Sequence, residues 1–122
     1  MFIIYDAYDK IINGGGLPMN LTFIRNCTGS CGDRSDLDVI VDADFKLVVV
    51  AATKSDSNPG AWNADDMKIL SGEGTKLKAV VYRTNSNSTG CCAVFTNVTK
   101  NTKIHSGWVG YGSGTIVAMC FN

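Results

Sequence analysis

Five cysteines carry the most reactive side chains in this sequence: Cys27, Cys31, the adjacent pair Cys91 and Cys92, and Cys120. The Cys27-x-x-x-Cys31 spacing would allow two thiolates to bind zinc with a third from the adjacent pair, although this spacing is looser than in a zinc knuckle. The same two cysteines could instead close a small disulfide loop in an oxidising setting. A third interpretation treats the cysteines as small buried apolar residues, with Cys120 the clearest case. We expect the third, and therefore neither a metal nor a cofactor.

The residue types needed for catalysis are scarce. His105 is the only histidine and Glu73 is the only glutamate. Ser106 follows His105 directly, and neighbouring residues of a strand point to opposite faces, so these two do not form a nucleophile–base pair. The sequence has no nucleophile motif, phosphate loop or dinucleotide fingerprint. We expect a protein that is not an enzyme, with no catalytic residues and with His105 as an exposed structural residue.

Four aspartates alternate with apolar residues in one segment. Asp36, Asp38, Asp42 and Asp44 fall on one parity of this segment, so a strand would place them on one face. Their carboxylates could bind calcium, but the Asp-x-Asp-x-Asp-Gly loop of a calcium site is missing. We expect a solvated face, or charges that keep an edge strand from pairing with another chain.

A glycine-rich segment with two aromatic residues, residues 107–114, suggests ligand binding most directly. Glycine lets the backbone approach a ligand closely, and Trp108 and Tyr111 offer flat apolar faces with polar edges. Trp62, which follows a Pro-Gly pair, could act with them. Stacking of this kind suits sugar rings or an apolar partner. The alternative is a bulged strand that packs its aromatic side chains in the core.

The elements that must position these residues are short strands separated by turn residues. Such spacing predicts a single all-β domain over residues 1–122, an antiparallel, jelly-roll-like β-sandwich rather than a closed barrel. At most one short helix is expected, a turn over residues 63–67. Residues 14–16, 27–32, 55–60 and 85–90 are expected to interrupt the strands because they are rich in glycine and small polar residues. The predicted strands cover residues 2–5, 20–26, 37–42, 45–53, 76–84, 91–98 and 114–121, with weaker ones near 67–70 and 104–109.

Residue parity indicates which strands are buried. From residue 36 to 45 the odd positions are apolar and the even positions are mostly acidic, as in a half-buried strand. From residue 115 to 121 almost every position is apolar. We therefore expect the last strand to be central in its sheet or to be covered by a neighbouring subunit.

Composition narrows the possible partners. Eleven basic residues balance eleven acidic ones, so the basic excess of a nucleic-acid-binding protein is missing. No apolar run approaches the length of a membrane span, and no secretory leader is visible. We expect no nucleic-acid or membrane partner, and either cytoplasmic synthesis or a place in a virion.

Two functional hypotheses remain. The first is a self-associating structural or interaction protein, such as a small virion or phage component, that forms a homo-oligomer, for example a trimer. The alternative is a carbohydrate-binding β-sandwich that holds a glycan on Trp62, Trp108 and Tyr111. Exposure of Trp108 separates the two, because the first hypothesis places its ring in the core or at a subunit interface.

Overall fold

The computed structural model describes residues 20–55, 67–85 and 88–122; for residues 82–85 and 88 it describes the backbone only. These residues form strands and loops, and none of them lies in a helix that could cross a membrane. The strand predicted over residues 2–5 and nearly all of the helical turn predicted over residues 63–67 lie outside the described residues. The eight strands are β1 (Phe23–Cys31), β2 (Ser35–Ile40), β3 (Phe45–Ser55), β4 (Lys68–Ser71), β5 (Thr75–Asn85), β6 (Ser88–Val98), β7 (Lys103–Val109) and β8 (Gly114–Phe121).

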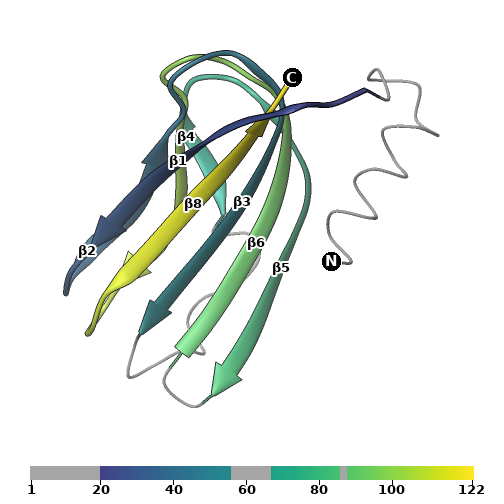
Figure 1. Ribbon diagram of the computed structural model, residues 1–122. Coiled ribbons are helices and arrows are strands. Elements are labelled where there is room, and N and C mark those ends of the chain that lie inside the picture. Colours follow the sequence, from purple (N-terminus) through teal and green to yellow (C-terminus); the bar gives the residue numbers. More distant parts are fainter. Residues whose placement is uncertain (1–19, 56–66, 86–87) are drawn as a thin grey trace.

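The strands form two antiparallel sheets, which confirms the predicted all-β sandwich. Sheet A has the order β1-β8-β3-β6-β5, and sheet B has the order β2-β7-β4 (Figure 1). The pairs β1–β8, β2–β7 and β3–β6 are nested, as in a chain folded back on itself near its middle. This nesting is that of a jelly roll, except that β5 extends sheet A beside β6 instead of joining β4.

All eight described strands coincide with predicted ones, and the largest error concerns β1. Residues 27–32 were expected to interrupt the chain, but β1 continues as far as Cys31. This strand lies at the edge of sheet A, and after the exposed Phe23 and Ile24 at its start its outward residues, Asn26, Thr28 and Ser30, are polar. An edge strand of this composition resembles a loop in the sequence, because only its inward residues, Cys27, Gly29 and Cys31, face the core and none of them is a large apolar residue.

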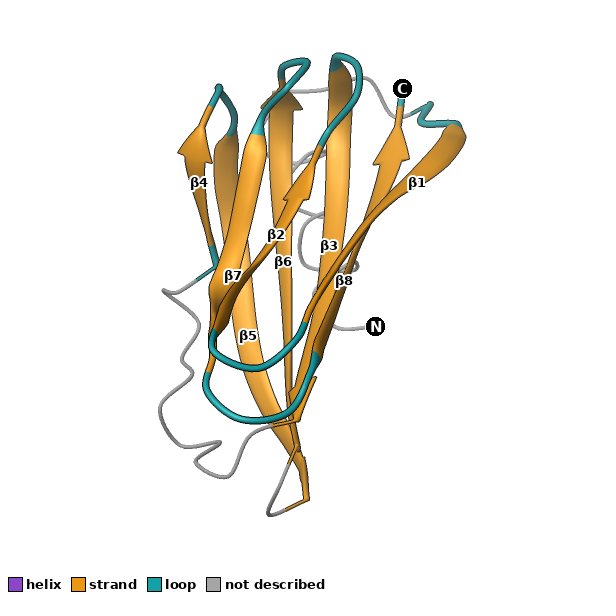
Figure 2. Cartoon of the chain, turned by 90° about the vertical axis from the view of Figure 1, so that its left-hand side faces the viewer, coloured by secondary structure: helices purple, strands orange, loops and turns teal. Residues whose placement is uncertain are grey.

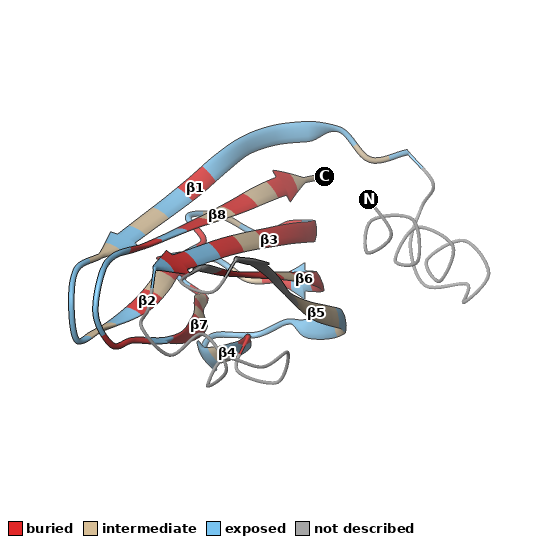
Figure 3. Cartoon of the chain, turned by 90° about the horizontal axis from the view of Figure 1, so that it is seen from below, coloured by how far each residue is buried: buried red, intermediate tan, exposed pale blue. Residues whose placement is uncertain are grey.

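The core lies between the two sheets and follows the predicted parity. Leu37, Val39 and Phe45 point inward and are buried, while the aspartates of the same segment remain at the surface. Strand β8 lies between β1 and β3, so the prediction that it is central is confirmed. In Figure 3, β3 and β8 carry buried residues along most of their length. The inner faces of β3, β6 and β8 meet sheet B through Val48, Val50, Ala52, Cys91, Ala93, Phe95, Ile116, Ala118 and Cys120.

One end of the sandwich is closed by the β1–β2 turn and the β7–β8 loop, drawn as two neighbouring teal loops in the lower half of Figure 2. The backbone N–H of Arg34 donates to the carbonyl of Gly110 at 2.8 Å, and Asp33 accepts a hydrogen bond from the N–H of Gly112 at 2.5 Å. Arg34 adopts a left-handed backbone conformation, with φ of 53°. These bonds hold the end of β7, which carries Trp108, against the start of β2.

Candidate functional site

The outer face of sheet B brings together four of the residues singled out in the sequence, Asp36, Asp38, His105 and Trp108, and adds Lys68. Asp36 of β2 pairs with Trp108 of β7. In the next row, His105 of β7 lies between Asp38 of β2 and Lys68 of β4. All five alternate with residues that point into the core, so their side chains share the face turned away from sheet A.

His105 and Asp38 form a close polar pair at the centre of this face. The Nδ1 atom of His105 lies 2.6 Å from Oδ1 of Asp38, and both side chains are mostly covered. The expectation of an exposed histidine was therefore wrong, because the neighbouring strands shield the ring. Ser106 points the other way, into the core, where its hydroxyl donates to the carbonyl of Leu37 at 3.3 Å. The predicted separation of His105 from Ser106 is confirmed.

A β-bulge places Trp108 on the same face as His105. The register between β2 and β7 shifts at Leu37 and Asp38, and Gly107 on the facing strand has φ of 127°. Without this irregularity, residues 105 and 108 would point to opposite faces. The sequence correctly suggested a bulged strand, but the bulge turns Trp108 outward rather than into the core. Its side chain is 54% exposed.

Lys54 of sheet A holds the backbone of Trp108 in place by a hydrogen bond between the two sheets. It continues the inward row of β3, is only 4% exposed, and donates from Nζ to the carbonyl oxygen of Trp108 at 3.1 Å. A charged group buried this far needs polar partners, and this one ties β3 of sheet A to β7 of sheet B. Trp108 therefore stands on a fixed strand end rather than on a loose loop.

Tyr111 lies beyond the end of β7, in the loop that closes the sandwich, and is exposed. The guanidinium of Arg34 stacks 5.1 Å from the centre of its ring and donates to its hydroxyl at 3.0 Å. One face of this ring is thus occupied by Arg34 within the chain itself. Of the three predicted aromatic residues, Trp108 lies on the sheet face, Tyr111 lies at the sandwich end, and Trp62 lies outside the described residues.

Exposed apolar residues lie at the end of the sheet B face that is farther from Trp108. Ile40 of β2 and Leu70 of β4 are both about as exposed as Trp108. Lys103 of β7 pairs with Ile40 on one side and with Ser71 of β4 on the other. Two cavities, of about 320 and 340 Å³, include no residue of this face. A sheet face with apolar ends and a charged centre suits an extended ligand or another protein better than a small enclosed molecule.

No disulfide joins the five cysteines, all of which lie among the described residues. Cys27 and Cys31 lie four positions apart on one straight strand, roughly 13 Å at the usual rise per residue. A disulfide requires Cα atoms within about 7 Å, so the small loop considered from the sequence cannot form in this fold. Cys27, Cys91 and Cys120 are buried in the core, as the third interpretation of the cysteines predicted.

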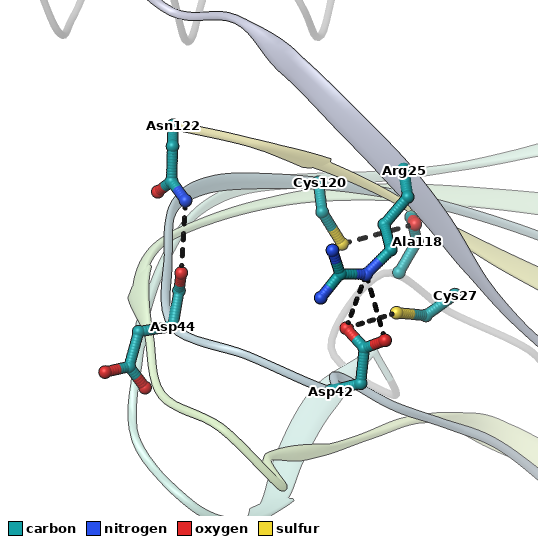
Figure 4. Close-up of polar contacts among 7 residues, drawn as sticks. All are labelled: Arg25, Cys27, Asp42, Asp44, Ala118, Cys120 and Asn122. Carbon is teal, nitrogen blue, oxygen red and sulfur yellow. Dashed lines mark hydrogen bonds and ion pairs between the residues drawn. The ribbon is translucent and has the colours of Figure 1, made fainter.

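Two of these cysteines adjoin a charged cluster at the β1 edge of the sandwich, drawn in Figure 4. Arg25 donates from Nε to both carboxylate oxygens of Asp42, at 3.0 and 2.9 Å, and its guanidinium lies 5.3 Å from the ring centre of Phe45. Cys27 donates from Sγ to Asp42 at 3.4 Å. Burial, and next the adjoining Cys27, raise the pKa of Cys120 to about 12. At neutral pH this thiol is protonated, so it is not a nucleophile.

The four aspartates of the 36–44 segment do not form one site. Asp36 and Asp38 lie on the sheet B face, and β2 is an edge strand, in keeping with the predicted role of edge charges. Asp42 binds Arg25, and Asp44 accepts a hydrogen bond from the N–H of Lys100 at 2.7 Å. Across the described part of the chain, no three His, Cys, Asp or Glu residues are placed to hold a metal ion.

The fold and its surface define an antiparallel β-sandwich with one aromatic and charged outer face. No protein-family model, no curated protein and no solved structure matches the chain.

Proposed function

We propose that the protein is a carbohydrate-binding β-sandwich that holds a glycan chain on the outer face of sheet B, with Trp108 as the stacking platform. The exposure of the Trp108 ring on a rigid strand carries this proposal. A Trp ring offers an apolar surface large enough for a sugar ring, and its N–H can donate to a hydroxyl.

The residues around Trp108 supply hydrogen-bonding groups that match sugar hydroxyls. Asp36 lies directly across the strand pair, and the His105–Asp38 pair lies one row further along the face. Carboxylates accept hydrogen bonds from sugar hydroxyl groups, and the ammonium group of Lys68 can donate hydrogen bonds to sugar oxygens. The two rows together provide both donors and acceptors beside the platform.

Binding to an array of defined oligosaccharides, followed by calorimetry with the strongest ligand, tests this function. Replacing a central aromatic anchor commonly costs at least 2 kcal/mol of binding free energy, so Trp108→Ala should weaken binding about thirtyfold. Leu70→Ala is the matched control on the same face and should change affinity less than threefold. Absence of glycan binding at millimolar concentration, or equal effects of the two substitutions, would refute the proposal.

The exposed apolar side chains of this face favour a second function, self-association as a structural component. Ile40, Leu70 and Trp108 together give sheet B an apolar rim that a second copy could cover. Light scattering after size exclusion, at micromolar and submicromolar concentrations, tests this function. A defined oligomer that survives dilution and that Leu70→Asp converts to a monomer would favour assembly. A monomer at both concentrations would exclude it.

A further inference from the structure

Two lysines of the sheet B face have no polar partner within the described part of the chain. Lys68 of β4 pairs with His105 of β7, and Lys103 lies two residues before His105 on the same strand. Both lysine side chains therefore belong to the outward row, and both reach solvent. Over residues 20–55, 67–85 and 88–122, no hydrogen bond or ion pair engages either ammonium group. The two charges are available to a ligand.

The two lysines are close enough to bind the same anion. Across an antiparallel pair of strands, a residue lies about 7–8 Å from the diagonal neighbour of its partner. Lysine carries its ammonium group on a flexible aliphatic chain, so both groups can turn towards a point between them. Two like charges this close disfavour one another, and a bound anion would relieve their repulsion. Ser71, which pairs with Lys103 and is exposed, adds a hydroxyl group next to them.

The aspartates of this face do not neutralise the lysines. The carboxylate of Asp38 lies 2.6 Å from Nδ1 of His105, and among the described residues no ion pair joins it to Lys68. Asp36 lies across from Trp108, one row further along β2. Both aspartates belong to the β2 edge of sheet B, whereas the lysines lie towards the β4 edge. The face thus has an acidic side and a basic side, and negative groups of a ligand would fall on the basic side.

We propose that the glycan held on sheet B is acidic, and that Lys68 and Lys103 together bind one of its carboxylate or sulfate groups. This inference rests on the proposed glycan function and names the class of sugar. Trp108 pairs with Asp36 and Lys103 pairs with Ile40, so four residues of β2, about 13 Å, separate the stacking platform from the farther lysine. A single sugar ring cannot span this distance. The ligand is therefore an oligosaccharide that stacks one ring on Trp108 and places its charged group near β4.

Pairs of glycans that differ chiefly in charge test this inference. The oligosaccharide array is extended with oligogalacturonate and its methyl ester, and with sulfated carrageenan oligosaccharides and their desulfated form. In calorimetry, at least one acidic member should bind about tenfold more tightly than its neutral counterpart, because hydrogen bonds between charged groups are the stronger ones. Molar NaCl should abolish this preference, since salt screens exposed charges. The two pairs distinguish a carboxylate from a sulfate as the bound group.

Substitution of both lysines should remove the preference for charge and leave stacking intact. In Lys68→Met with Lys103→Met, the acidic and neutral members should bind within about twofold of each other. Lys68→Arg with Lys103→Arg keeps both charges and should retain the preference. Lys46→Met is the matched control, because Lys46 is exposed on β3 of sheet A and loses the same unit charge without effect. Circular dichroism verifies folding, and if the double Met variant does not fold, Lys68→Met alone should lower the preference about threefold.

The outcomes separate this inference from the proposed function. Equal binding of acidic and neutral members, weakened in both by Trp108→Ala, would refute an acidic ligand and leave the glycan function standing. Absence of binding to every glycan of the array would refute both. A preference that survives the double Met substitution would refute the role of Lys68 and Lys103. Inorganic polyphosphate that binds as tightly as the acidic glycans, and equally well to Trp108→Ala, would show that the lysines bind anions in general, which would also overturn the proposal.

Discussion

Gly29→Ala tests the approach of β1 to β2, on which the geometry of the sheet B face depends. A Cβ atom at Gly29 would overlap the carbonyl oxygen of Asp38 and would lie 3.2 Å from the carbonyl carbon of that residue and 3.0 Å from Cγ2 of Ile116. Because the obstacle is mainly backbone, it cannot move aside as a flexible side chain would. Overpacking of this kind costs about 3 kcal/mol, and alanine recovers about 1 kcal/mol over glycine within a strand. The expected net loss of unfolding free energy is about 2 kcal/mol.

Urea unfolding followed by circular dichroism measures this loss. With an m-value of about 1.5 kcal/mol per molar for a chain of this size, the midpoint should fall by more than about 1 M. Gly32→Ala is the matched control, because nothing lies within 4 Å of the Cβ position at Gly32. Alanine there should change stability by less than about 0.5 kcal/mol or stabilise slightly, since it restricts the unfolded chain. Equal stability of the two variants would show that β1 and β2 do not approach each other as described.

The same substitution connects packing with the proposed function. The backbone of Asp38 lies against Gly29, while its carboxylate contacts His105 on the outer face. A displacement of β2 therefore moves both aspartates beside Trp108. Gly29→Ala should weaken glycan binding even at temperatures where the variant remains folded, whereas Gly32→Ala should not.

Three further predictions concern the edge cluster and the core. The hydrogen bond from Arg25 lowers the pKa of Asp42, so the folded state favours the ionised carboxylate. Asp42→Asn should therefore be less stable than the wild type at pH 6. The difference in stability, measured by urea unfolding at several pH values, should shrink as the pH falls below about 4. Cys120, with a pKa of about 12, should react with a thiol reagent at pH 8 only through unfolding, with the same urea dependence as global unfolding. Phe95→Ala removes the largest fully buried side chain among the described residues and should lower the unfolding free energy by about 3–5 kcal/mol, measured from the thermal and urea transitions.

The strands were predictable where burial imposes a pattern on the sequence. Strand β8 begins and ends at the predicted residues because both of its faces are apolar, which no loop of that length would be. Strand β1 was predicted over 20–26 and so ended five residues too early, because an edge strand needs only one apolar face and here that face consists of two cysteines and a glycine. Local composition thus locates central strands better than edge strands.

The candidate site was predictable in its residues but not in its arrangement. The Trp108 ring was selected from the sequence for its chemistry, yet its direction depends on the bulge at Gly107, which the alternation rule cannot anticipate. The pairing of His105 with Asp38 joins residues 67 positions apart and follows from the register of β2 and β7. The covering of one Tyr111 face by Arg34 depends on two turns that meet only in the folded chain.

The two outer faces of the sandwich differ in a way that limits how the protein can use them. On sheet A the outer face carries a cluster that is apolar throughout, and Leu47, Val49 and Val94 are buried at its centre. On sheet B the apolar side chains stand at the ends, and charged residues separate them, so a partner needs hydrogen-bonding groups as well as apolar surface. A glycan provides both without desolvating ionised groups completely, whereas a second copy would have to bury Asp36, Lys68 and Lys103 together. That cost favours the proposed glycan over a second copy as the partner of the sheet B face.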